Sequence, residues 1–169
     1  MASINGIAIK SVRKFRDHED CMIAQGNVYF NGRKLGFWSQ DSWGGPDRFD
    51  FDESLLSKEV ESYRLHAPME KEEYRAFADL SCLLYDLLAL TDEEKTYKKG
   101  VKQGFRTYVS VKDALRSGGY WSDAPADSVL TRSFHQDFLK KFFAGPRLPR
   151  DGEIKVTVYG SPDDFVKTY

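Results

Sequence analysis

The sequence predicts an α+β fold, with an N-terminal antiparallel β-meander of about four strands covered by helices and a further C-terminal strand. Two apolar runs flank Asn31-Gly32, the strongest short-range hairpin signal, because both central residues of a type I′ turn need positive φ. A second turn follows at Trp43-Gly44-Gly45-Pro46. Further along the chain, apolar residues recur three and four positions apart, as on one face of a helix.

The four strands of the meander are expected at residues 7–15, 22–30, 35–39 and 48–51, where polar and apolar side chains largely alternate. The charged residues 16–20 would turn the first strand into the second. Four antiparallel strands bury one face only when another element covers it. We therefore expect helices on that face.

The helical cover is expected after the meander. A short helix is predicted near residues 55–63, a largely buried helix over about residues 70–90, and a new helix from Asp92, because Thr91-Asp-Glu-Glu94 has the form of a capping box. Leu84 lies at the centre of the apolar stripe of the long helix and is expected deep in the core. The stripe consists of Tyr74, Phe77, Leu80, Leu84, Leu87 and Leu88.

The C-terminal part is expected to hold a helix at about residues 128–144, stopped by Gly145-Pro146, and a strand at residues 153–159. Residues 117–126 contain glycine, serine and proline and are expected to form a mobile loop. This order of elements predicts a single α+β domain over residues 1–169. The inward-facing stripe of the helix is expected to be Leu130, Phe134, Phe138 and Phe142.

Composition narrows the class of protein. The chain has 169 residues, of which 41% are hydrophobic and 30% are charged, as in folded globular proteins. The net charge of −1 gives no overall field that would attract DNA or an acidic membrane. No apolar run approaches the roughly 18 residues of a membrane span, and no signal peptide is evident. We expect a cytoplasmic protein without cofactors, with Cys21 and Cys82 reduced.

No catalytic constellation is evident, and we expect the protein not to be an enzyme. The three histidines, His18, His66 and His135, have no second ligand at metal-binding spacing, so no metal site is expected there. There is no Gly-x-Ser-x-Gly, and neither cysteine lies in a nucleophile context. The sequence therefore names no catalytic residue.

An acidic group near the second turn supports one enzymatic alternative, a metal-dependent hydrolase that uses the carboxylates of residues 41–53. Oxygen clusters of this kind bind hard cations. Alternating acids on a strand are also what a solvent-facing side normally carries, and the fixed spacing of a calcium loop is missing. The carboxylates in question are Asp41, Asp47, Asp50, Asp52 and Glu53.

Residues 95–116 support a second alternative, binding of nucleic acid. The segment holds seven Lys or Arg residues against one acid, Asp113, and its aromatic rings could stack on bases. The competing interpretation is a solvated helix face that balances the acids just upstream. The candidate nucleic-acid contacts are Lys98, Lys99, Lys102, Arg106 and Tyr108.

Aromatic residues beside glycines support the leading hypothesis, binding of a protein partner. Tryptophan and tyrosine are enriched at the energetic centres of protein interfaces. Such rings also plug the ends of small sheets, so both interpretations stay open. The candidate contact residues are Trp38, Trp43, Tyr120 and Trp121.

The segment Val28-Tyr-Phe-Asn-Gly-Arg-Lys-Leu-Gly36, followed by Asp41-Ser-Trp-Gly-Gly45, resembles small uncharacterised proteins found on phages and plasmids. The resemblance covers about a fifth of the chain, and its motif is structural. It implies a mobile-element origin, where small proteins without catalytic motifs often act as stoichiometric inhibitors of host defences. An anti-CRISPR-like inhibitor of a host nuclease or ribonucleoprotein is the most specific form of the leading hypothesis. The oligomeric state stays open.

Overall fold

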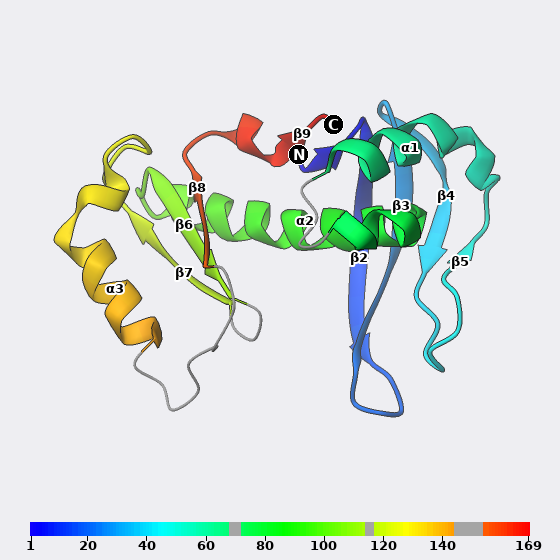
Figure 1. Cartoon of the computed structure of the whole chain (residues 1–169), viewed down its shortest axis with the longest axis horizontal. Helices are drawn as coiled ribbons and strands as arrows, with labels where there is room; N and C mark the ends of the chain where they lie inside the picture. Colours follow the sequence, from blue (N-terminus) through cyan, green and yellow to red (C-terminus); the bar gives the residue numbers. More distant parts are fainter. Residues whose placement is uncertain (68–71, 114–116, 144–153) are drawn as a thin grey trace. The chain divides into compact units, whose positions relative to one another are not determined.

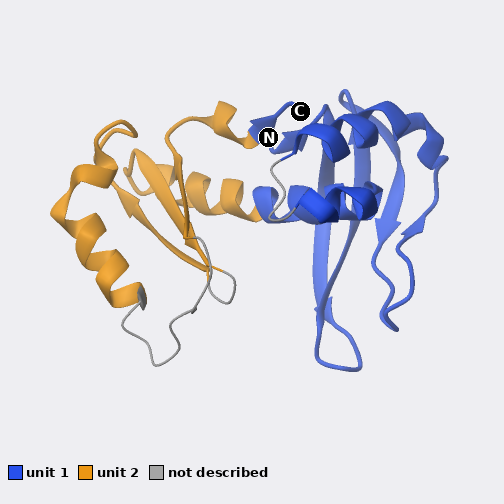
Figure 2. Cartoon of the chain, in the orientation of Figure 1, with its two compact units in different colours: residues 1–91, 166–169 blue, residues 92–165 orange. Residues whose placement is uncertain are grey.

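The computed structural model describes residues 1–67, 72–113, 117–143 and 154–169, and it confirms the α+β class. The chain divides into two compact units, a division that the sequence pattern did not predict. Unit 1 comprises residues 1–91 and 166–169, and unit 2 comprises residues 92–165 (Figure 2). Predictions that fall on residues 70, 114–116, 144–146 and 153 lie outside the described residues.

Unit 1 is built on a six-stranded sheet with the strand order β5-β4-β3-β2-β1-β9. Its neighbouring strands are antiparallel, except that β1 and β9 are parallel. The predicted meander is confirmed and corresponds to β2 through β5 (Figure 1). The strands are β1 (Ser3–Ile4), β2 (Ile7–Arg16), β3 (Met22–Phe30), β4 (Arg33–Ser39), β5 (Arg48–Phe49) and β9 (Val166–Lys167).

Two turns of the sheet use an Asn-Gly pair, and one of them was expected. Asn31 and Gly32 have φ values of 47° and 82°, so both occupy the left-handed region that a type I′ turn requires. The β1–β2 turn uses Asn5 and Gly6 in the same way, with φ values of 49° and 78°. The predicted hairpin at Asn31-Gly32 is thereby confirmed.

The β2–β3 hairpin changes character along its length. Its register shifts between Lys10 and Arg13, and Ser11 has a positive φ of 54°. Before this bulge the side chains of β2 are mostly buried, and after it they are mostly exposed. The far end of the hairpin therefore projects beyond the core of unit 1 (Figure 1).

Partly buried polar contacts tie α1 to the β1–β2 turn and to α2. Asn5 donates from Nδ2 to the carbonyl of Glu59 on α1 at 2.9 Å, and Tyr63 donates from its hydroxyl to Asp86 on α2 at 2.7 Å. Leu84 is fully buried, as predicted. The helices are η1 (Glu53–Leu56), α1 (Ser57–His66), η2 (Glu72–Phe77) and α2 (Leu80–Lys102), the last of which continues into unit 2.

The prediction of two helices divided at Asp92 is wrong. The Thr91 hydroxyl donates to the carbonyl of Leu87 at 2.7 Å, so the side chain bonds within the helix rather than capping a new one. The start of the predicted long helix is also wrong, since residues 72–77 form the separate η2. Tyr74 and Phe77 are therefore exposed instead of belonging to the buried stripe. Cys82 is an exposed free thiol on α2.

Unit 2 contains a three-stranded antiparallel sheet in the order β7-β6-β8. Its buried centre comprises Val109, Val111, Ala124 and Val129, and Phe138 and Phe142 of α3 pack against it. Its elements are β6 (Thr107–Lys112), β7 (Ser117–Ser122), η3 (Val129–Thr131), α3 (Ser133–Phe143), β8 (Lys155–Tyr159) and η4 (Pro162–Phe165).

The expected mobile loop at residues 117–126 is wrong over its first half, which is β7. Its two glycines permit close packing. A Cβ atom at Gly118 would lie 2.9 Å from Phe142, and one at Gly119 would lie 2.5 Å from the Tyr108 hydroxyl. Glycine here makes room for neighbouring aromatic rings within a strand.

The expected helix at residues 128–144 is divided in two, because Arg132 has an extended backbone between η3 and α3. Only the C-terminal part of the predicted stripe faces the core. Leu130 and Phe134 are exposed, whereas Phe138 and Phe142 face inward as predicted.

Candidate functional site

Three exposed apolar side chains and a histidine lie at the far end of unit 1. We call this cluster the tip, and it consists of Phe15, His18, Met22 and Trp43. Trp43 has 78% of its surface exposed, and its indole lies on the imidazole of His18 with ring centroids 3.9 Å apart. Phe15 and Met22 are also exposed, at the ends of β2 and β3.

The tip presents apolar side chains on two sides. In the β2–β3 register, Phe15 lies opposite Ile23 and Met22 lies opposite Arg16. Cross-strand partners project to the same face and successive residues project to opposite faces, so Phe15 and Met22 lie on opposite faces of the hairpin.

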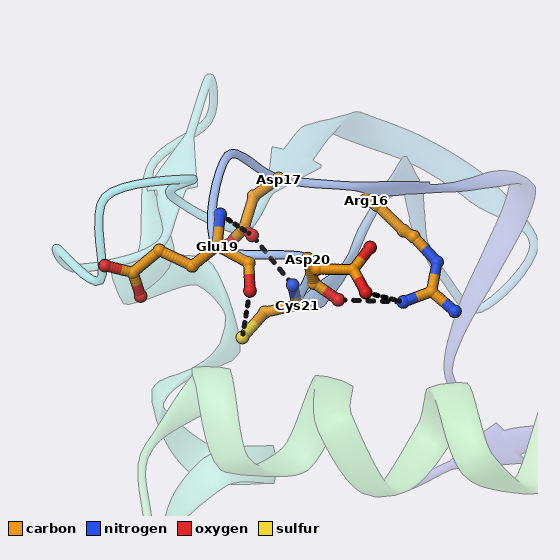
Figure 3. Close-up of polar contacts among 5 residues, drawn as sticks. All are labelled: Arg16, Asp17, Glu19, Asp20 and Cys21. Carbon is orange, nitrogen blue, oxygen red and sulfur yellow. Dashed lines mark hydrogen bonds and ion pairs between the residues drawn. The ribbon is translucent and has the colours of Figure 1, made fainter.

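The turn that carries His18 is held by local hydrogen bonds (Figure 3). The Asp17 carboxylate accepts from the backbone N–H groups of Glu19 at 2.9 Å and Cys21 at 2.8 Å. The Arg16 guanidinium donates to the carbonyl of Asp20 at 2.9 Å and pairs with its carboxylate at 2.9 Å. Because these bonds define the turn, the His18 ring has a fixed place beneath Trp43.

The β4–β5 loop that carries Trp43 is organised by two acidic side chains. Asp41 accepts from the backbone N–H of Trp43 at 2.8 Å and pairs with Arg48 at 3.6 Å. Asp47 accepts from the indole Nε1 of Trp38 at 2.7 Å. Trp43 is therefore presented by a loop with internal bonds, which lowers the ordering cost of a contact.

The candidate contact Trp38 requires a correction. Its side chain has no exposed surface, and its only polar atom is bonded to Asp47. It belongs to the core of unit 1, where alternation along β4 directs it inward. Burial therefore argues against Trp38 as a contact residue, whereas Trp43 is well placed for one.

Two further carboxylates of residues 41–53 accept hydrogen bonds from the backbone. Asp50 accepts from the backbone N–H of Phe37, and Asp52 caps η1 by accepting from Ser54 at 3.0 Å. Hydrogen bonds from Ser54 lower the pKa of Asp52. Across residues 1–67, 72–113, 117–143 and 154–169, no group of three or more potential ligands is arranged for a metal ion. The hydrolase alternative stays a hypothesis from the sequence.

Tyr120 and Trp121 lie in unit 2, where both are half-buried and line a cavity of about 280 Å³. The indole of Trp121 donates to the carbonyl of Thr96 at 3.0 Å and stacks on Phe105 with centroids 5.9 Å apart. These two candidates therefore belong to a recessed site within unit 2, whereas Trp43 belongs to the tip of unit 1.

The Tyr120 hydroxyl and His135 Nδ1 form a hydrogen bond of 2.7 Å at the wall of this cavity. Burial lowers the pKa of His135 and raises the pKa of Tyr120. Both groups are therefore neutral near pH 7. This pairing has no signal in the sequence, because Tyr120 and His135 lie on different elements and no local spacing connects them.

Some of the candidate nucleic-acid contacts already interact with other side chains of the protein. Lys98 pairs with Glu94 at 2.6 Å, and the Lys99 ammonium lies 5.8 Å from the Trp121 ring. Tyr108 is half-buried and stacks on Tyr159 with centroids 6.1 Å apart, so it is poorly placed to stack on a base. Lys102 and Arg106 are exposed.

Comparisons with protein-family models, curated proteins and solved structures found no match. In the part of the chain that the structure describes, no helix has both the length and the apolar character needed to cross a bilayer.

Proposed function

We propose that this protein acts without catalysis, by binding another protein through the tip. The observation that carries the proposal is the exposure of Trp43 on an internally bonded loop, with its ring supported by His18. Tryptophan often supplies a large share of the binding free energy at interfaces. Because Phe15 and Met22 flank the hairpin on opposite faces, the partner is expected to receive the tip in a groove.

A host nuclease or ribonucleoprotein of a defence system is the partner to test first. This choice rests on the resemblance of residues 28–45 to phage and plasmid proteins, which implies an anti-CRISPR-like inhibitor of mobile-element origin. A stoichiometric inhibitor abolishes its target's activity at a fixed molar ratio. An enzyme that inactivates the same target would do so at far below one molecule per target.

The binding test uses Trp43→Ala with Phe77→Ala as its matched control. Phe77 is an aromatic residue of unit 1 with 79% of its surface exposed, and it lies on η2 rather than at the tip. Affinity capture with the wild type and both variants should recover a protein that only Trp43→Ala fails to retain. With that partner purified, Trp43→Ala should lose at least about 2 kcal/mol of binding free energy.

Two results would contradict the proposal. One is a partner that binds Trp43→Ala as tightly as it binds the wild type. The other is a combination of two findings. Affinity capture recovers no partner that depends on the tip, and the same purified proteins bind single-stranded RNA or DNA in a salt-dependent manner. The second result would favour the nucleic-acid alternative through residues 95–116.

A further inference from the structure

The cavity of unit 2 is formed by residues that are distant in sequence and does not depend on the tip. Phe105 follows α2, Trp121 and Tyr120 belong to β7, and Phe134 and His135 begin α3. Its volume of about 280 Å³ is near the lower end of the range for small-molecule sites. It can therefore admit one small ring system, with any substituents left at the mouth.

Aromatic rings form the walls. Trp121 and Phe105 are nearly parallel, at 22°, and the hydrogen bond from Trp121 to Thr96 fixes the indole orientation. Phe134 meets Tyr120 edge-to-face with centroids 5.1 Å apart, yet has 59% of its surface exposed. Flat, rigid walls of this kind favour a flat ligand, because stacking requires no adjustment of the walls.

The polar groups have different roles. His135 is 4% exposed and uses Nδ1 for its bond with Tyr120, which leaves Nε2 as the ring nitrogen available to a ligand. Arg132 and Asp123 also line the cavity, and both are exposed. The cavity therefore offers a neutral hydrogen-bonding group, His135, on its inner side and the Arg132 guanidinium on its exposed side. This pair suits a ligand that has a neutral polar ring and an anionic substituent.

We propose that this cavity binds a nucleotide, with the base against the aromatic walls and the phosphate at Arg132. The neutral Tyr120–His135 pair would meet the polar edge of the base, and in CMP alone among the probes below Asp123 would also accept from an exocyclic amino group. A purely apolar ligand would leave His135 and Arg132 unused. The nucleotide can be free or can be an unpaired residue of a single strand, and Lys99 beside Trp121 would then meet a neighbouring phosphate.

The test titrates the full chain with UMP, CMP, uridine and inorganic phosphate, and follows the indole N–H signals by NMR. The signal of Trp121, assigned by its loss in Trp121→Phe, should shift with the nucleotides, while that of Trp43 should not. Arg132→Gln should weaken UMP binding about tenfold and uridine binding much less. Phe134→Ala should weaken both, and Lys140→Ala, an exposed change further along α3, should weaken neither.

A ten-residue oligo-U and a ten-residue oligo-dT distinguish the sources. Tighter, salt-dependent binding of an oligomer that Arg132→Gln and Phe134→Ala both weaken would identify the strand as the source. If UMP and the oligomers bind with equal affinity, the free nucleotide is identified as the source of the ligand. The proposal is overturned if neither moves the Trp121 signal at millimolar concentration, or if inorganic phosphate alone reproduces the shifts. It is also overturned if both variants bind like the wild type.

Discussion

The indole ring of Trp43 lies over the imidazole ring of His18, with centroids 3.9 Å apart and planes inclined by 32°. This contact joins the β2–β3 turn to the β4–β5 loop, two segments that are otherwise connected through strands. Each segment has its own carboxylate support, Asp17 in the turn and Asp41 in the loop. The ring contact therefore aligns two independently folded segments at the tip.

Replacing Trp43 with Ala should move the NMR signals of the His18 ring protons, because the ring current of the overlying indole disappears. The free energy of unfolding should fall by no more than about 1.5 kcal/mol, since Trp43 is mostly exposed and aromatic contacts are worth about 0.5–1.5 kcal/mol. The measurements are a proton–carbon NMR spectrum and urea unfolding. Unmoved His18 signals would show that the rings do not stack in solution.

Gly100→Ala should destabilise the protein even though Gly100 lies within α2. Helix propensity alone favours the change by about 1 kcal/mol. A Cβ atom there would lie 2.4 Å from Cδ1 of Trp121, whose ring is held by Thr96 and Phe105, and overpacking costs about 1–3 kcal/mol. Thermal melting of the variant and the wild type measures whether helix propensity or overpacking has the larger effect.

The smaller side chain of Trp121→Leu should reduce the penalty of Gly100→Ala when the two changes are combined. A higher melting temperature for Gly100→Ala in the wild-type background would mean that the indole can move aside and that helix propensity decides the result.

Leu84→Asp should abolish soluble expression, or lower the free energy of unfolding by about 3–5 kcal/mol, because an unpaired charge would replace a fully buried side chain. Tyr85→Asp is the matched control, since Tyr85 is the next residue of α2 and has 59% of its surface exposed. Expression and chemical unfolding of both variants measure the difference. Similar stability of the two would contradict the assignment of this helix face to the core.

Acidification should destabilise the wild type more than His135→Gln. Burial lowers the pKa of His135 below its ordinary value of 6.5. Between the lowered pKa and the ordinary value, His135 binds a proton in the unfolded chain but not in the folded protein. The free energy of unfolding therefore falls as the pH drops through about 6.5, by at most about 1.4 kcal/mol per pH unit for this one group. Tyr120, Arg132 and Asp123 remain in both proteins.

The measurement is urea unfolding of both proteins between about pH 7.5 and pH 5. At the higher pH the variant should be the less stable one, because it loses the fitted bond with Tyr120. The difference between the free energies of unfolding of the two proteins should become smaller as the pH falls. Parallel pH profiles would show that His135 titrates equally in the folded and unfolded chains.

The meander could be predicted because its signals are local. Asn31-Gly32 specifies its own backbone geometry, and alternation marks the strands on either side. The continuity of α2 could not be predicted, because the Thr91 hydroxyl can cap a helix or bond back to Leu87, and local sequence does not choose between these. Strand β7 was missed because Gly118 and Gly119 serve contacts with Phe142 and Tyr108, which are distant along the chain.

The candidate sites, too, could be predicted only where the sequence signal is local. Trp43 was placed in a loop by its neighbouring glycines, and the structure exposes it there. Trp38 flanks the same predicted turn but points inward from β4, and the alternation of that short strand was too brief to show it. The cavity of unit 2 was not predictable, since Tyr120 and His135 meet only after the sheet and α3 have packed.

The parallel pairing of β1 with β9 has a consequence for synthesis on the ribosome. Ser3 pairs with Val166, and Asn5 bonds to the backbone of Lys167 and Tyr169, so one edge of the first sheet waits for residues that are made after all of unit 2. Unit 2 emerges in full before that edge can close, although chains usually fold from the N-terminus as they are made. Unit 1 should therefore stay open at β1 while unit 2 is being made, with an unpaired strand edge exposed to chaperones until residues 166–169 emerge.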